Sequence, residues 1–154
     1  MSTFERLCRW LESKLPKTTI TIQGKPYLTR CYIFGKDRAW GNIYLHHFHS
    51  SDQGDELHNH PWEWGLSLIM AGGYSEEYRG EHNGIDGFPV HRREKRPGQL
   101  NLIRAGDFHR VDLHDEQKGA WTLFFAGPRT GDWGFWDRHT QEFKDWRTNP
   151  EAIA

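Results

Sequence analysis

The segment Leu57-His58-Asn59-His60-Pro61-Trp62 places two histidines one residue apart. Side chains two positions apart on a β-strand project from the same face, so a strand here directs two imidazoles toward one point in space. This arrangement suits a metal ion inside a β-sheet protein, but two histidines fill only part of a coordination sphere. We therefore expect a β fold in which a separate strand supplies at least one more ligand.

His109, in the downstream segment Gly106-Asp107-Phe108-His109, is the candidate for that ligand. The residues that follow alternate, so that His109, Val111 and Leu113 share one face of a predicted strand. If Val111 and Leu113 face the core, His109 faces it too, because the side-chain period of a strand is two. We expect this histidine to complete a metal site with the two upstream histidines.

The composition favours strands and turns over helices. Aromatic residues make up 14% of the 154 residues, and the chain contains eight tryptophans and sixteen glycines. Aromatic side chains suit pleated surfaces, and glycines suit tight turns. A chain of this length suits one domain with its own core, which we place at residues 1–154.

Residues 1–16 form the exception, because their pattern is helical. Ser2 and Glu5 make a capping box, and Pro16 stops the run. Apolar residues recur between them at helical spacing: Phe4, Leu7, Leu11 and Leu15. We expect one N-terminal α-helix packed on the outside of a sheet domain.

The remainder, residues 18–146, reads as a β-barrel. About ten short runs of β-branched and aromatic residues are separated by turn residues every eight to twelve positions or so. This pattern predicts an all-β barrel or double-sheet jelly roll, which leaves few strand edges exposed. A parallel α/β fold requires alternating helices that the sequence lacks.

Charge and hydropathy exclude several classes of partner. The net charge of −1 gives no sign of a general nucleic-acid or membrane surface. The longest apolar run, around Leu66 to Ala71, is far shorter than the roughly 20 residues that a membrane helix needs. No leader pattern precedes Cys8 and Cys31, so we expect reduced thiols, a cytoplasmic location and a small-molecule substrate.

A second group of histidines, His46, His47 and His49, precedes the first motif. His47 and His49 share one strand face, and His46 lies on the other. We expect one of them to contact the substrate or the metal ligands and the others to be exposed. His46 is thus one pocket candidate, and Tyr74 is the other. Tyr74 either directs its hydroxyl into the pocket or packs as an ordinary aromatic residue of a strand.

These motifs together resemble the cupin superfamily over roughly residues 42–127. The first cupin motif is matched by the His-x-His strand and the glycine turn Gly72-Gly73. The second is matched at the family's spacing by Gly98, Arg104, Gly106 and His109. The resemblance implies an all-β double-stranded β-helix, the cupin jelly-roll barrel, with one N-terminal helix added.

A narrower likeness connects the chain with small cupin-like proteins of unassigned function in bacteria and phages. It rests on Leu57 to Trp62, on Trp121-Thr122-Leu123 and on Gly127-Pro128-Arg129. Two positions depart from the general cupin pattern, because Arg104 replaces the usual proline and Leu113 a frequent asparagine. The likeness supports the fold more than any particular reaction.

The resemblance also raises the question of a fourth ligand. The first cupin motif expects a glutamate at the position of Trp64 or Gly65, and neither residue is acidic. Glu63 stands one residue early. It either reaches the metal through a bulge next to Pro61 or points to solvent, so the set is His58, His60 and His109 with or without Glu63.

A site of three histidines resembles that of thiol dioxygenases, and cupins bind Fe(II), Mn, Ni, Cu or Zn. We favour Fe(II) and an oxygenase that acts on a small polar molecule. Hydrolytic zinc chemistry suits the same ligands. Two further alternatives are a non-catalytic cupin, either a small-ligand binder or a phage accessory protein, and a sugar isomerase or epimerase with a base such as His46. Cupins commonly pair their barrels, which makes a homodimer an expectation.

Overall fold

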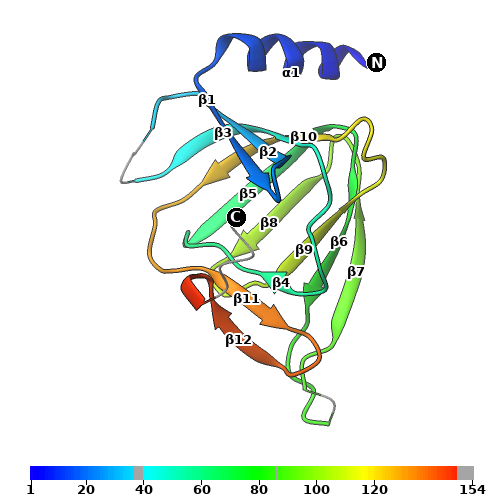
Figure 1. Ribbon diagram of the computed structural model, residues 1–154, viewed down its shortest axis with the longest axis vertical. Coiled ribbons are helices and arrows are strands. Elements are labelled where there is room, and N and C mark those ends of the chain that lie inside the picture. Colours follow the sequence, from blue (N-terminus) through cyan, green and yellow to red (C-terminus); the bar gives the residue numbers. More distant parts are fainter. Residues whose placement is uncertain (37–39, 86, 149–154) are drawn as a thin grey trace.

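The computed structural model describes residues 1–36, 40–85 and 87–148, in which one helix precedes two antiparallel β-sheets (Figure 1). Residues 149–154 of the predicted domain lie outside the described residues. The elements are α1 (Thr3–Lys14), β1 (Lys17–Ile22), β2 (Lys25–Tyr32), β3 (Asn42–Phe48), β4 (Leu57–His58), β5 (Trp64–Ala71), β6 (Tyr74–Arg79), β7 (Val90–Lys95), β8 (Leu100–Arg104), β9 (His109–Leu113), β10 (Ala120–Ala126), β11 (Gly134–Asp137), β12 (Glu142–Asp145) and the 3-10 helix η1 (Trp146–Thr148).

Each sheet contains six strands among the described residues. The first has the order β1-β2-β3-β10-β5-β8, and the second has the order β12-β11-β4-β9-β6-β7. Strands distant in the chain are neighbours, as Figure 1 shows for β3 and β10. This crossing of connections between two sheets is the arrangement of a jelly roll. The all-β prediction and the N-terminal helix are therefore confirmed.

Helix α1 covers the outer face of the first sheet. The Ser2 hydroxyl accepts a hydrogen bond from the backbone N–H of Glu5 at 3.1 Å, as the capping pattern predicts. The buried Cys8 packs with Cys31, Leu45 and Trp121 of the sheet. Both cysteines are free thiols. Within the described residues, no helix is both long and apolar enough to cross a membrane.

The inner faces of the two sheets pack around three apolar clusters. Their buried members are Tyr44, Ile103, Phe124 and Ala126 in the first, Ile69, Tyr74, Val111 and Ala120 in the second, and Leu57, Phe108 and Trp136 in the third. His109 and Val111 are both buried, as the alternation on their strand predicts. The register places His109 opposite His58 on one side and opposite Tyr78 on the other.

The predicted strand through both His58 and His60 is wrong at its second half, because β4 ends at His58. Pro61 has no N–H to donate to a ladder, which disfavours a continued strand. Asn59 instead bonds to β11, since Gly134 N–H donates to its side-chain oxygen at 2.8 Å. His60 therefore follows the strand in an irregular segment.

The glycine turn between β5 and β6 provides a test of the fold. Gly72 and Gly84 have nearly equal φ angles of 74° and 78°, so alanine meets the same backbone strain at both. A Cβ at position 72 would lie 2.2 Å from the carbonyl oxygen of Gly119, whereas position 84 has nothing within 4 Å. We expect Gly72→Ala to lower the free energy of unfolding by about 1–3 kcal/mol more than Gly84→Ala. Urea denaturation measures both, and equal losses would contradict the close packing of this turn.

Candidate metal centre

The side chains of His58, His60 and His109 converge between the two sheets. One ligand atom from each lies within 4.8 Å of the other two. The ring centroids are 5.0 Å apart for His58 and His60 and 4.7 Å apart for His58 and His109. The Nε2 atoms of His60 and His109 are 2.8 Å apart. Two adjacent ligands at about 2.1 Å from an octahedral ion are separated by about 3 Å, so this spacing fits a common metal.

Carboxylates lie behind two of the three rings. Glu76 Oε1 is 2.7 Å from His109 Nδ1, and Asp52 Oδ2 is 3.5 Å from His58 Nδ1. Metal-binding histidines usually engage their second nitrogen in this way, which sets the ring orientation and the tautomer. The Glu76 contact is a hydrogen bond that occupies Nδ1 of His109, and the longer Asp52 contact also faces Nδ1 of His58, so that Nε2 is the nitrogen of each ring on the side away from its carboxylate.

Glu76 is one of two residues next to the histidines that the sequence patterns did not predict. It is 0% exposed, and it accepts hydrogen bonds from Arg93 Nε at 2.5 Å and from Asn101 Nδ2 at 2.7 Å. Burial alone raises its pKa, but the hydrogen bonds from His109, Arg93 and Asn101 outweigh burial and lower the pKa to about 2. The side chain is therefore an ionised carboxylate in the interior. Glu76 alternates with Tyr74 and Tyr78 on one face of β6, and this alternation is the sequence pattern that could have predicted an inward-facing glutamate.

Asp52 was also missed, and its position is held from two sides. Its Oδ2 accepts the backbone N–H of Val111 at 2.7 Å, and its Oδ1 accepts a hydrogen bond from the Tyr27 hydroxyl. These contacts connect the loop before β4 to β9 and β2. They place the carboxylate next to His58 through residues far from it in sequence.

Two histidines of the cluster, His58 and His60, are neutral near pH 7. Burial lowers the pKa of His58 to about 4, despite the opposing charges of Asp52 and Glu76. Burial, and then the neighbouring charges of His58, His109 and Arg30, lower the pKa of His60 well below its usual range. A neutral imidazole carries the lone pair that a metal ion requires.

Glu63 lies apart from the three histidines. Its side chain is exposed, and its backbone is engaged on both sides, with N–H donating to Pro128 and C=O accepting from Ala105, each at 2.9 Å. The preceding residue, Trp62, turns inward and stacks on His60 with ring centroids 5.2 Å apart. Because neighbouring side chains on extended backbone alternate, the structure does not bring Glu63 to this centre.

His46 is buried on the inner face of β3, on the opposite sheet from His58 and His109. Its Nε2 accepts a hydrogen bond from Arg30 Nε at 3.2 Å, and its ring stacks on Phe124 at 5.1 Å. Phe124 in turn lies 6.4 Å from the ring of His60. Burial and the charge of Arg30 both lower the pKa of His46.

Tyr74, the other pocket candidate, is a buried core residue. Its hydroxyl accepts a hydrogen bond from Asn101 Nδ2 at 3.4 Å, and its ring lies 6.4 Å from that of Phe48. Burial raises the pKa of this phenol. Tyr74 therefore packs beside the polar group around Glu76.

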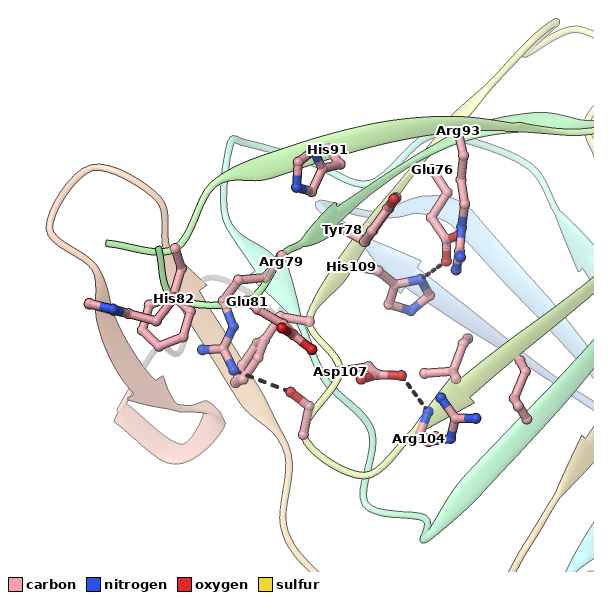
Figure 2. A pocket seen from close by; sticks show the side chains of 16 residues that line it. Glu76, Tyr78, Arg79, Glu81, His82, His91, Arg93, Arg104, Asp107 and His109 are labelled. Atoms are coloured by element: carbon pink, nitrogen blue, oxygen red, sulfur yellow. Dashed lines mark hydrogen bonds and ion pairs between the residues drawn. The ribbon is translucent and has the colours of Figure 1, made fainter. Parts of the chain in front are cut away.

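A cavity of about 690 Å³ reaches the centre from the side (Figure 2). Residues of β6, β7, β8 and the segment before β9 line it. Glu76, Arg93 and His109 lie together in one part of this cavity, and Arg79, Glu81 and His82 lie in another. The volume suits a small molecule, and His109 is the member of the histidine cluster that it reaches.

Comparisons with known proteins rest on structure alone. No protein-family model and no curated protein matches the sequence. Among solved structures, the Fe(II) form of HppE superposes with a TM-score of 0.56 at 9% identity, over 74% of this chain and 57% of that chain. This chain thus spans little more than half the length of HppE.

Two further structures have similar scores. A protein from Ralstonia eutropha JMP134 that is assigned as a mannose-6-phosphate isomerase has a TM-score of 0.53 at 16% identity, over 71% of this chain and 91% of that chain. Streptomyces PAC13, solved with uridine, has a TM-score of 0.50 at 4% identity, over 75% of this chain and 78% of that chain. At these identities the likeness concerns the fold and carries no reaction with it. The chain therefore has the fold of the cupin superfamily, as the two histidine motifs predict.

Proposed function

We propose that the protein is a mononuclear metal-dependent cupin enzyme, an Fe(II) oxygenase with His58, His60 and His109 as its metal ligands. The observation that carries the proposal is the convergence of three imidazoles, two of them with a carboxylate next to Nδ1. Neutral nitrogen donors suit Fe(II), Zn, Cu and Ni. Fe(II) is favoured because the HppE structure of the same fold is an Fe(II) form.

The chain supplies ligands and orientation, and a bound ion supplies coordination positions for substrate and O₂. Glu76 holds His109 with its Nε2 toward the ion, and Asp52 does the same for His58. Trp62 stacks on His60 and fixes the third ring. The rings of Trp62 and Phe124 pack beside His60, and such apolar surroundings strengthen these electrostatic contacts.

The substrate that the site supports best is a small anion. The Arg30 guanidinium lies 5.0 Å from the ring centroid of Tyr44 and 5.8 Å from that of Trp62. Among the described residues, no carboxylate lies within 4.0 Å of it. A guanidinium held over aromatic rings beside a metal centre is suited to bind a carboxylate or a phosphonate.

His46 acts in this proposal as a positioning residue for Arg30. Its Nε2 is engaged by the Arg30 N–H, so the lone pair that a general base needs is already used. This contact favours the oxygenase over a sugar isomerase that relies on His46 for proton transfer. A non-catalytic binder of small anions is the remaining alternative, and oxygen consumption separates the two.

The metal ligands can be tested by paired substitutions. We expect the double variant His58→Ala, His109→Ala to lose the nitric oxide adduct that the untagged protein forms after anaerobic reconstitution with Fe(II). The matched control His114→Ala, His139→Ala removes two exposed histidines and should retain it. Electron paramagnetic resonance measures the adduct. A signal in the first variant equal to that of the unaltered protein would contradict the assignment of these ligands.

The role of the buried carboxylate has its own test. Glu76→Gln keeps the shape of the side chain but removes the charge that faces His109 Nδ1, so we expect Fe(II) affinity to fall by about 10–100-fold. Glu77→Gln is the control, because Glu77 lies on the opposite face of β6 and bonds to Arg138. Competition with a chromophoric chelator measures both affinities, and similar values for the two variants would argue against this role.

Catalysis is tested by oxygen consumption of the Fe(II)-loaded protein with a panel of small carboxylates and phosphonates. We expect at least one compound to be oxidised, and Arg30→Gln to raise its KM by about tenfold or more with Fe(II) content unchanged. Lys36→Gln, at an exposed position in the loop after β2, should leave KM unaltered. If none of the compounds in the panel causes O₂ consumption, the result would favour the non-catalytic alternative.

A further inference from the structure

A second group of metal-ligating side chains lies on the outside of the first sheet, under helix α1. Glu12 of α1, His47 of β3 and His49 directly after β3 each offer one ligand atom within 4.8 Å of the other two. Glu12 Oε1 is 3.3 Å from His47 Nδ1, and the rings of His47 and His49 are 4.0 Å apart. Donors at about 2.0–2.2 Å from a tetrahedral ion are separated by roughly 3.3 Å, so the spacing is close to that of a zinc site.

This group is separate from the three-histidine centre, because β3 alternates between two faces. His46 points into the space between the sheets, where it stacks on Phe124, whereas His47 points outward and stacks on Trp121 at 3.7 Å. The two histidine groups therefore do not share a ligand. An ion bound by the outer group would not depend on the presence of an ion at the three-histidine centre.

The imidazoles of the outer group are held in place by their surroundings. The ring of His47 lies nearly parallel to that of Trp121, at 13°, and its side chain is 9% exposed. Nε2 of His49 is 2.8 Å from Thr29 Oγ1, which leaves Nδ1 of that ring to face an ion. Metal-binding histidines in proteins show this division of their two nitrogens.

The charges around the group do not already neutralise Glu12. A hollow of about 410 Å³ at this place is lined by two cations and two carboxylates, Arg9, Lys118, Glu12 and Glu116. Arg9 donates two hydrogen bonds to Glu5, at 3.2 and 3.0 Å, and Lys118 is paired with Asp115 at 2.7 Å. Both cations thus have carboxylate partners on their own segments.

We infer that Glu12, His47 and His49 form a second metal site that takes a divalent ion of the zinc class. Two imidazoles and one carboxylate are a donor set that zinc binds, with a fourth position for water. The ion would connect α1 to β3 and so fasten the helix to the barrel, in addition to the packing of Cys8. The site would be structural in its effect, since α1 docks through only one fully buried side chain.

The test is zinc stoichiometry of the untagged, full-length protein after chelator treatment and reconstitution with Zn²⁺ alone. We expect Glu12→Gln to bind one ion fewer per chain than the unaltered protein. Glu142→Gln is the matched control, because it removes the same charge at an exposed position on β12, in the other sheet. Zinc should also raise the Tm of the His58→Ala, His109→Ala variant, and this rise should vanish when Glu12→Gln is added.

Each result has one meaning. One ion fewer in Glu12→Gln than in Glu142→Gln supports the second site, whether or not the three-histidine centre binds zinc. Equal zinc content in Glu12→Gln and its control overturns the second site. Neither variant alters the barrel core, and circular dichroism of each confirms the fold before the comparison is made. Loss of zinc only on substitution of His58 and His109 would leave the first centre intact as a proposal and remove the second.

Discussion

The buried carboxylate of Glu76 is the group on which the rest of the site depends. It comes from β6, and its partners Arg93, Asn101 and His109 come from β7, β8 and β9. An ionised carboxylate without partners in the interior would be strongly destabilising. Because Asn101 belongs to one sheet and the other three residues to the other, this network joins the two sheets next to the cavity. The same bonds that satisfy the charge also orient a metal ligand.

Strand β3 connects the inner centre with the outer face of the barrel. Its alternation sends His46 inward toward Arg30 and His47 outward beneath α1, so one short histidine-rich segment contributes to two chemically different surroundings. Both rings are buried, contrary to the expectation that most of this group is exposed. Aromatic stacking, on Phe124 inside and on Trp121 outside, explains why both faces accept a histidine.

The similarity to cupins of known structure explains the architecture and leaves the chemistry to the particular side chains. The compared structures are an Fe(II) form of HppE, a protein assigned as a mannose-6-phosphate isomerase and a complex with uridine, and each of them superposes on this chain. This chain has no acidic residue at positions 64 and 65, and its Arg30 guanidinium lies over the rings of Tyr44 and Trp62. The first feature bears on the set of metal ligands, and the second bears on the charge of the proposed substrate.

The sequence by itself determined the features that depend on local pattern. The capping box and apolar spacing predict α1, the alternation after Gly106 turns His109 inward, and the two motif spacings predict the barrel. Only the tertiary structure decided which groups meet. Glu76 reaches His109 because β6 pairs with β9, and Glu12 reaches His47 because α1 folds back over β3. Such contacts join residues far apart in the chain, and no periodicity within a single segment records the register or the docking that creates them.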